Sequence, residues 1–584
     1  LLLLGLRRLA RGGNRGLSIT VAALVLSLAG GHPESLFHAV AAAGLFFAAE
    51  LVARRGSGGR QTRRALGGAL AAGVLALLLS GPQLFPLLEA IPRSAEYRAR
   101  ARAVSRSVAS QSVPASEAAA RLLPAVLPFA HGIYGKSSVQ AEREDGSGMP
   151  LAYAGGVLLP FAALGAARRR EGRALFLAAA AAGLLLGASA PGLIDVLTRL
   201  PGFSLALNYR LVFLAGFGLA GLAALGAERT IEEGNGRRIA IAAAVSALLL
   251  AGALAAARGV FRERALSGEF VAMHALFEIA PVAFLAAAGL VWRRRAGRAV
   301  AAGLVLLVAQ RGLEMGGTYP TRPASELAPP FPELDRARRD PGRVVALGGD
   351  LRPNGAALLG LEDVRGYESI VLDRFADTFP LWCVPQPASF NRVDDLSRPF
   401  LDFLSARFAI GSPAAPAPSG WEVRARSASL SLFENPRALA RAFAPARIVA
   451  QPDPSRVIQS MAAARDFSDA AWVASLPGGA RELANPPSDL SVRREGGDLL
   501  IDARVPSAGR LFVATSLPDW PGWRAHAGGS RLELQTVNHA FVGVWFPSGA
   551  VRARLSFVPP SFPAGLAAFA LGVFAIAAHS IRRR

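Results

Sequence analysis

The polar stretch Gly30-Gly31-His32-Pro33-Glu34-Ser35 separates two apolar runs, residues 17–29 and 36–52. Arginines flank this pair of runs on both outer sides: Arg7, Arg8, Arg11 and Arg15 before it, and Arg54, Arg55, Arg60, Arg63 and Arg64 after it. Two apolar helices with positive outer ends and a short turn between them are typical of a membrane hairpin. The positive-inside rule places the basic flanks in the cytoplasm and the His-Pro-Glu turn on the outer face of the membrane.

The composition of the 584-residue chain supports a membrane protein, because 52% of its residues are hydrophobic. Its mean hydropathy of +0.34 is too high for a soluble enzyme of this length. The formal net charge of +22 includes arginine clusters that adjoin apolar runs, for example 168–170, 293–295 and 582–584. Charge in these places sets membrane topology, so we predict no nucleic-acid partner. Cys383 is the only cysteine, which excludes an intrachain disulfide and a cysteine-based metal site.

The apolar runs predict about ten membrane spans, several of them shorter than the usual length of about 20 residues. They lie near 17–31, 35–52, 65–80, 151–167, 174–188, 211–227, 239–257, 270–292, 299–312 and 563–580. The charge pattern agrees with this series, because the predicted inner loops at 168–173, 228–238 and 293–298 contain arginines. The alternation leaves two long outer segments, near 81–150 and 313–562.

The predicted fold class is therefore a polytopic α-helical membrane bundle with an extracytoplasmic α/β module and a small β-sandwich. The predicted domains are a bundle at 1–312 with an outer loop at 81–150, an α/β module at 313–485, a sandwich at 486–561 and a last transmembrane helix at 562–584, which ends in the cytoplasm. The α/β module is indicated by strands near 343–347, 431–433 and 448–450 and by helices near 397–407 and 455–466. The sandwich is indicated by alternating runs at 499–503, 510–516, 531–537, 541–546 and 551–557.

Several polar residues are candidates for a site at the outer ends of the helices. Arg210 comes just before the sixth span, and Glu89 is predicted at the same depth. Arg210 has two readings: an interfacial side chain that reaches toward water, or a clamp on the phosphate of a lipid-linked substrate. His32, Glu34 and His38 are residue types that bind metals, but their spacing across a tight turn and a helix makes joint ligation awkward. We therefore interpret them as a polar cluster and predict no metal site and no cofactor; a divalent metal has no support in the residues.

Two further motifs also have competing interpretations. Gly216-Phe217-Gly218-Leu219-Ala220-Gly221 matches a dinucleotide-binding pattern on paper, but it lies inside an apolar span with no preceding strand. Small residues that let transmembrane helices approach each other explain it better. Trp523, in Trp520-Pro521-Gly522-Trp523, has a core role or contacts a sugar acceptor by stacking.

Short motifs occur in the same order as in a known family. They are Gly31-His32-Pro33-Glu34, Pro82-Gln83-Leu84-Phe85-Pro86 with Glu89 and Ser94, Leu200-Pro201-Gly202-Phe203 with Arg210, Pro353-Asn354 with Gly366-Tyr367, Glu434-Asn435-Pro436 with Leu439 and Arg441-Ala442-Phe443, Pro521-Gly522-Trp523, and Pro559-Pro560. With these motifs the chain resembles the YfhO-type family of bacterial multi-pass membrane proteins, which is similar to the GT-C class of membrane glycosyltransferases.

The resemblance implies an enzyme of the bacterial cytoplasmic membrane that moves a sugar from a polyprenyl-phosphate carrier to a cell-surface polymer on the outer side. The partners would be the lipid bilayer, the polyprenyl-phosphate-linked sugar and the acceptor polymer. Arg210, His32, Glu34 and Glu89 would line the outer end of the lipid cavity, and Trp523 would contact the acceptor.

In the GT-C class the catalytic carboxylate lies in the first outer loop, and we expect that loop to precede Leu1, so no catalytic residue is assigned. One alternative is a non-catalytic scaffold or accessory protein that binds a wall polymer or partner. A transporter is disfavoured, because no repeat and no charged residue at mid-membrane are visible.

Overall fold

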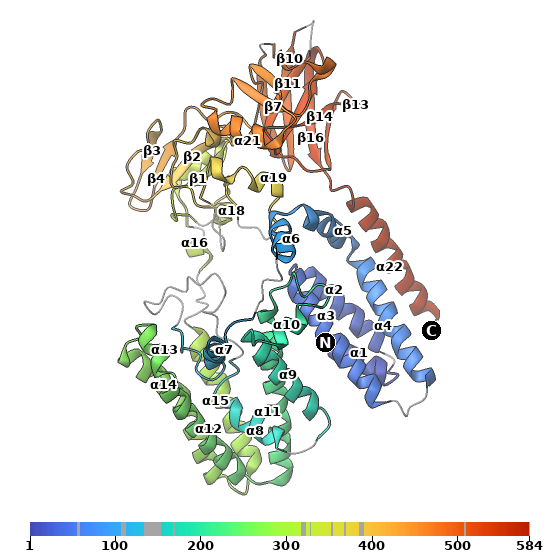
Figure 1. Cartoon of the computed structure of the whole chain (residues 1–584), viewed down its shortest axis with the longest axis vertical. Helices are drawn as coiled ribbons and strands as arrows, with labels where there is room; N and C mark the ends of the chain where they lie inside the picture. Colours follow the sequence, from blue (N-terminus) through green and yellow to red (C-terminus); the bar gives the residue numbers. More distant parts are fainter. Residues whose placement is uncertain are drawn as a thin grey trace. The chain divides into compact units, whose positions relative to one another are not determined.

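The computed structural model describes residues 1–13, 15–54, 59–106, 112–132, 153–167, 170–316, 323–327, 329–351, 354–366, 370–384, 391–486, 488–506 and 510–582 (Figure 1). Outside these ranges lie Arg55, residues 133–152, Arg168, Arg169, Pro353, Tyr367, Arg583 and Arg584, which several of the predictions use. The chain divides into two compact units. We call Leu1–Ala72 with Arg100–Thr321 the helical unit, and Gly73–Ala99 with Arg322–Arg584 the sheet unit.

The helical unit contains the predicted hairpin and most of the predicted spans. Its helices are α1 (Leu2–Ala10), α2 (Gly16–Ala29), α3 (Pro33–Ala53), the first part of α4 (Gly59–Leu79), the second part of α6 (Ala95–Arg106), α7 (Ala115–Leu122), α8 (Leu158–Ala166), α9 (Arg173–Gly187), α10 (Leu193–Leu197), α11 (Phe213–Glu233), α12 (Arg237–Ala256), α13 (Arg258–Glu263), α14 (Gly268–Val291) and α15 (Ala296–Gly316). Single 3₁₀ turns lie at Leu123–Ala125 and Asn208–Val212.

Within the described residues, six helices are long and apolar enough to cross a membrane. They are Pro33–Ala53, Gly59–Leu79, Asn208–Glu233, Arg237–Ala256, Gly268–Val291 and Ala296–Leu313. Three shorter apolar helices lie at Gly16–Ala29, Arg173–Gly187 and Phe562–Ala578. A helical membrane region is thus confirmed in its coarse form, whereas the count of about ten spans stays a prediction. At nine residues, α8 is far shorter than the length of about 20 that a span needs.

The outer faces of these helices carry large apolar side chains. Leu248 is 73% exposed, Leu249 68% and Phe284 66% in the isolated chain. A helix that exposes leucine and phenylalanine in this way is stable only if something apolar covers it, and lipid does so for a membrane span. The exposure pattern therefore agrees with the hydropathy pattern.

Glycines bring the helices of this unit into backbone contact. A Cβ atom at Gly218 of α11 would lie 2.4 Å from the backbone nitrogen of Ala180 in α9, and one at Gly221 would lie 2.3 Å from the Phe176 ring. A Cβ at Gly226 would lie 2.0 Å from the carbonyl oxygen of Phe161 in α8. The interpretation of the glycine motif as a helix-packing device is thereby confirmed for Gly218 and Gly221.

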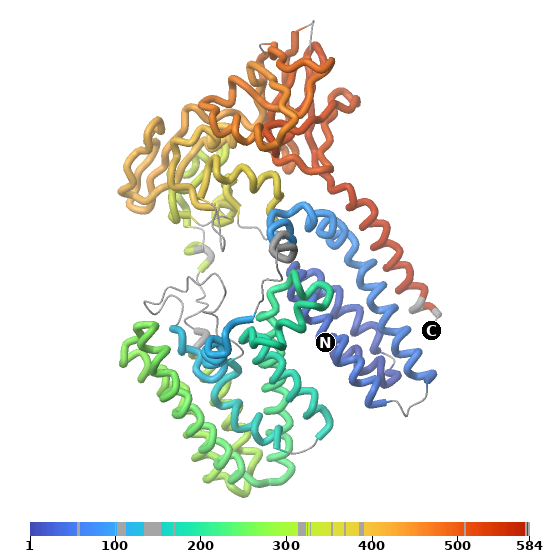
Figure 2. The backbone as a smooth tube through the Cα atoms, in the orientation of Figure 1, coloured from blue at the N-terminus to red at the C-terminus, as the bar shows by residue number. Residues whose placement is uncertain are grey.

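The sheet unit begins with the end of α4 and with α5 (Gly81–Ala90), which starts after a break at Ser80. α4 ends at Leu79, and Pro82 lies in the first turn of α5, where a proline fits a helix. Beside α5 runs α22 (Phe562–Arg582), drawn in red in Figure 2. The two helices touch at glycine, since a Cβ at Gly81 would lie 2.5 Å from the carbonyl oxygen of Gly565.

The first sheet of this unit has the strand order β1-β2-β4-β3. Its strands are β1 (Arg343–Ala346), β2 (Ala406–Gly411), β3 (Glu422–Arg426) and β4 (Ser431–Glu434). β1 and β2 run parallel, and the other pairs are antiparallel. Around the sheets lie η2 (Ile91–Arg93), α16 (Ala324–Leu327), α17 (Asp335–Arg339), α18 (Gly355–Leu358), α19 (Asp373–Ala376), α20 (Pro399–Phe403) and α21 (Pro454–Ala463). The predicted strands near 343–347 and 431–433 are therefore confirmed.

The other two sheets face each other as a sandwich, with orders β13-β12-β16-β10-β9 and β5-β11-β15-β14-β7-β6-β8. Their strands are β5 (Ala442–Phe443), β6 (Arg447–Ala450), β7 (Ala470–Val473), β8 (Glu482–Ala484), β9 (Leu490–Glu495), β10 (Asp498–Val505), β11 (Leu511–Pro518), β12 (Trp523–Ala527), β13 (Ser530–Arg531), β14 (Glu533–Val537), β15 (Phe541–Phe546) and β16 (Gly549–Phe557). Side chains of β10 and β16 from one sheet and of β11 and β15 from the other share one core, as expected for a sandwich.

The topology corrects the predicted boundary between residues 485 and 486. Strands β5 to β8 precede that boundary, yet they belong to the same sheet as β11, β14 and β15. All six residues of β15 are buried, because one face of this sheet packs on the sandwich core and the other on the core around Phe400 and Phe403. The α/β module and the sandwich are thus joined by one continuous sheet.

Candidate functional site at the hairpin turn

The hairpin turn is built by three residues with distinct local roles. Gly31 has φ +71°, a left-handed conformation that favours glycine. His32 caps α3 by accepting the backbone N–H of Ser35 at Nδ1, 3.1 Å away, and Pro33 occupies the first helical turn. The sequence therefore fixes where α3 starts and which way its first polar side chains point.

Arg210 meets this turn from a distant part of the helical unit. Its Nη1 atom donates to Oε2 of Glu34 at 3.0 Å and lies 2.8 Å from Nε2 of His32. Glu34 also accepts the backbone N–H of Leu207. The structure therefore brings together three of the four residues predicted to line a cavity: His32, Glu34 and Arg210.

The loop that carries Arg210 is held against α3 by buried contacts. His38 and Asn208 are both fully buried, and Nε2 of His38 lies 3.3 Å from Oδ1 of Asn208. Asn208 also donates from Nδ2 to the carbonyl oxygen of Phe203 at 2.7 Å. The rings of Phe37 and Phe203 lie 4.7 Å apart. His38 is therefore a positioning residue that fixes the loop.

The protonation of His32 determines what the cluster can bind. Because Nδ1 accepts the Ser35 N–H, the neutral ring carries its proton on Nε2. Nε2 faces Nη1 of Arg210, so two hydrogen-bond donors meet there. The Arg210 side chain is 35% exposed, and its Nε and Nη2 atoms make no hydrogen bond to any described residue. Two converging donors with an exposed guanidinium are suited to an anionic oxygen, such as one of a phosphate.

Glu89 lies in the sheet unit and has a different set of neighbours. Its Oε2 accepts the backbone N–H of Ser561, 3.1 Å away, just before α22, and its Oε1 lies 3.7 Å from Nη1 of Arg93. A carboxylate at the start of a helix stabilises it through the helix dipole. Glu89 therefore connects α5 to α22, and its place beside Arg210 stays a prediction.

Trp523 starts β12 and is half-buried. Its Nε1 donates to the carbonyl oxygen of Pro518 at 3.0 Å, and its ring lies 5.2 Å from that of Phe557. The side chain packs against the sandwich core. These contacts are those of a packing residue, and contact with an acceptor stays a prediction.

A buried polar group lies inside α14, a helix that is long and apolar enough to cross a membrane, and the sequence pattern did not single it out. Glu278 lies in the middle of α14 and is only 2% exposed. It accepts hydrogen bonds from the hydroxyl of Tyr153 and from Nε2 of Gln310, the latter at 3.0 Å. The statement that no charged residue lies at mid-membrane is therefore wrong. Glu278 was visible within the apolar run 270–292, but its partners were not.

A second missed cluster joins α6 to the sheets of the sheet unit. Arg98 donates from Nη2 to Oδ1 of Asp377 at 2.7 Å, and Nε2 of His539 lies 3.0 Å from the other carboxylate oxygen. Burial raises the pKa of Asp377, but the hydrogen bonds from Arg98 and His539 outweigh burial and hold this pKa below its usual value. Burial lowers the pKa of His539. These groups connect parts of the chain and enclose no pocket that the structure shows.

Within the described part of the chain, no group of three or more His, Cys, Asp or Glu side chains could hold a metal ion. No protein-family model, no curated protein and no solved structure matches the chain.

Proposed function

We propose that the protein is a membrane glycosyltransferase of the GT-C type, or a close functional analogue. It would move a sugar from a polyprenyl-phosphate carrier to a cell-surface polymer on the outer side of the bacterial cytoplasmic membrane. The proposal includes about ten spans, sheets outside the cytoplasm and a cytoplasmic C-terminus, as the arginine pattern predicts.

One observation carries this proposal. Arg210, whose Nη1 lies 2.8 Å from Nε2 of His32, lies just before the start of α11, a helix that is long and apolar enough to cross a membrane. A lipid phosphate needs cationic donors at the level where its apolar tail ends, and this cluster has that position and chemistry. The order of the YfhO-type motifs supports the same activity, because the Gly31-His32-Pro33-Glu34 motif and Arg210 are neighbours in space.

The test is binding of polyprenyl phosphate to the full-length chain in nanodiscs. Arg210→Ala should weaken binding by about tenfold to a hundredfold, since one charge-assisted hydrogen bond contributes about 1.5–3 kcal/mol. Arg199→Ala is the matched control, because Arg199 is an exposed arginine of the preceding loop with no described side-chain partner. Equal binding by the wild type and Arg210→Ala would refute the phosphate clamp.

The alternatives predict other outcomes of the same experiment. A scaffold would bind a wall polymer and transfer no sugar from the carrier in the same nanodiscs. A transporter is the second candidate, favoured by the buried Glu278 in the middle of α14, because ionisable groups within spans mark ion and substrate pathways. It would move a solute across the membrane of proteoliposomes without forming a glycosidic bond.

A further inference from the structure

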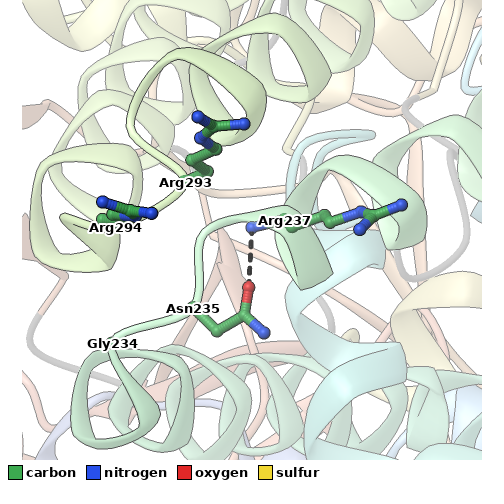
Figure 3. A pocket seen from close by; sticks show the side chains of 5 residues that line it. All are labelled: Gly234, Asn235, Arg237, Arg293 and Arg294. Carbon is green, nitrogen blue, oxygen red and sulfur yellow. Dashed lines mark hydrogen bonds between the residues drawn. The ribbon is translucent and has the colours of Figure 1, made fainter.

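An open, arginine-lined pocket lies at the end of α11 that is remote from Arg210. It has a volume of about 440 Å³ and is lined by Gly234, Asn235, Arg237, Arg293 and Arg294. Figure 3 shows that Gly234 and Asn235 come from the turn between α11 and α12, Arg237 from the start of α12, and the other two arginines from the turn after α14. All three arginines are exposed.

The two turns are fixed to each other, so the pocket is a feature of the fold. The backbone N–H of Gly236 donates to the carbonyl oxygen of Arg293 at 2.9 Å. A Cβ at Gly236 would lie 2.7 Å from the carbonyl oxygen of Trp292, which shows how closely the turns pack. Oδ1 of Asn235 accepts the backbone N–H of Arg237 at 3.1 Å and shapes the start of α12 (Figure 3).

The carboxylates near this pocket are already paired with other arginines. Glu228 and Glu232 bind Arg170. Glu233 binds Arg229, at 3.0 Å, and also Arg238. No ion pair joins Arg237, Arg293 or Arg294 to any carboxylate of the described residues. The pocket therefore carries three positive charges that no described carboxylate neutralises, and the guanidinium of Arg237 points away from those of Arg293 and Arg294 (Figure 3).

The position of the pocket places it at a membrane surface. Arg210 lies just before α11 and Gly234 just after it, and a helix of 21 residues is roughly 30 Å long. This length matches the hydrocarbon thickness of a bilayer, so the pocket and the Arg210 cluster lie at opposite membrane faces. The helices α12, which starts at Arg237, and α14, which ends just before Arg293, are both long and apolar enough to span a membrane.

We propose that Arg293 and Arg294 on one side of the pocket and Arg237 on the other bind the phosphates of anionic phospholipid headgroups in the cytoplasmic leaflet. Guanidinium groups donate paired N–H bonds to phosphate oxygens, and a phosphate supplies the negative charge that the pocket lacks. A lipid is the source that the location favours, because its headgroup lies at the ends of spanning helices while its acyl chains contact their apolar faces. The site is separate from the Arg210 cluster and does not depend on the proposed sugar transfer.

The test uses the full-length chain in nanodiscs of phosphatidylcholine with increasing phosphatidylglycerol, and it measures quenching by a spin-labelled phosphatidylglycerol. The triple variant Arg237→Gln, Arg293→Gln, Arg294→Gln should lose phosphatidylglycerol affinity by about a hundredfold, from the usual contribution of each arginine near an anionic surface. The matched control removes the same charge near the other end of α12 by changing Arg258, Arg262 and Arg264 to Gln. The control should retain the affinity of the wild type.

Three results would overturn the proposal. Equal phosphatidylglycerol affinity of the triple variant and the wild type would show that the arginines act only as topology determinants. Equal loss in the triple variant and its control would show a general charge effect. The site would take a free anion and not a lipid if inorganic phosphate displaced phosphatidylglycerol at a concentration comparable to that of the lipid. The same conclusion would follow if inorganic phosphate bound, in nanodiscs of pure phosphatidylcholine, as tightly as phosphatidylglycerol does. Matching unfolding temperatures of the variants exclude misfolding as the cause.

Discussion

Glu434 is the residue whose replacement tests the electrostatics of the sheet unit most directly. Its side chain is only 3% exposed at the end of β4, and it contacts Arg424 at 2.6 Å, Arg336 at 2.8 Å and Arg407 at 3.2 Å. Glu434→Gln keeps the shape of the side chain but removes its charge. Three guanidinium groups are then left around a neutral amide.

The expected loss follows from the number and exposure of the partners. A charge-assisted hydrogen bond contributes about 1.5–3 kcal/mol, and breaking a buried ion pair costs about 3–5 kcal/mol. The side chains of Arg336, Arg407 and Arg424 are 57%, 32% and 37% exposed, so water takes up part of the lost interaction. We therefore expect Glu434→Gln to lower the local stability of β2 and β4 by about 2–3 kcal/mol.

The pH dependence gives an independent check on this reasoning. Burial raises the pKa of Glu434, but hydrogen bonds from Arg424 and Arg336 outweigh it and leave the folded-state pKa below the ordinary value. A lowered folded-state pKa means that the stabilisation is complete above the unfolded pKa of about 4.3 and is lost as the pH falls through the folded-state value. The stability difference between wild type and Glu434→Gln should therefore be constant near neutral pH and shrink in acid.

Hydrogen exchange of β2 and β4 amides in the detergent-solubilised full chain measures this local stability. Glu422→Gln is the matched control, because Glu422 contacts Arg424 at 2.7 Å but its side chain is 53% exposed. The control should change the free energy of local opening, as derived from hydrogen exchange, by less than about 0.5 kcal/mol. The reasoning is refuted if Glu434→Gln exchanges like the wild type at neutral pH, or if the control is equally destabilised.

Two further predictions concern helix packing and the joint between α6 and α19. Gly218→Leu should destabilise the packing of α11 on α9 by about 3 kcal/mol or more, because its Cβ would lie 2.4 Å from the backbone nitrogen of Ala180. Gly216→Leu should be tolerated, since nothing lies within 4 Å of its Cβ; equal thermal unfolding of the two variants would contradict the packing argument. Asp377→Asn should weaken the protection of α6 in hydrogen exchange by about 1 kcal/mol or less, because the Asp377 side chain is 35% exposed. Since the folded-state pKa of Asp377 is lowered, this difference should disappear as the pH falls through that pKa, and persistence of the full difference in acid would count against the ion pair.

Local sequence patterns predicted those secondary-structure elements that depend on residues close together in the sequence. The polar stretch at 30–35 predicted a turn between two helices, and the structure has this turn, with His32 as the cap and α3 starting at Pro33. The alternation of Val551, Ala553, Leu555 and Phe557 with the polar residues between them predicted β16 and its buried face. The structure confirms the strand and the burial of the first three, whereas Phe557 is 38% exposed. Strand β12 was missed because Trp523 follows Pro521 and Gly522, which read as a turn.

Pairings between distant residues could not be predicted in the same way. Nothing in the run around Glu278 indicates that Tyr153 and Gln310 approach it, since these residues come from different helices or loops. The domain boundary predicted between residues 485 and 486 was misplaced for a similar reason. The hydropathy pattern changes there from mixed to alternating, but this change does not show that β7 pairs with β14. Strand pairing depends on register across the sheet, which each strand's own pattern leaves open.

The sequence by itself determined that this chain has apolar helices with arginines at their ends and a β-rich segment before the last helix, because periodicity and charge placement are local properties. Only the tertiary structure decided that Glu34 meets Arg210, 176 positions along the chain, and that Arg237, Arg293 and Arg294 line one pocket. The physical reason is that contacts between helices depend on which small residues allow close approach and on how loops fold back. Both are outcomes of packing the whole unit.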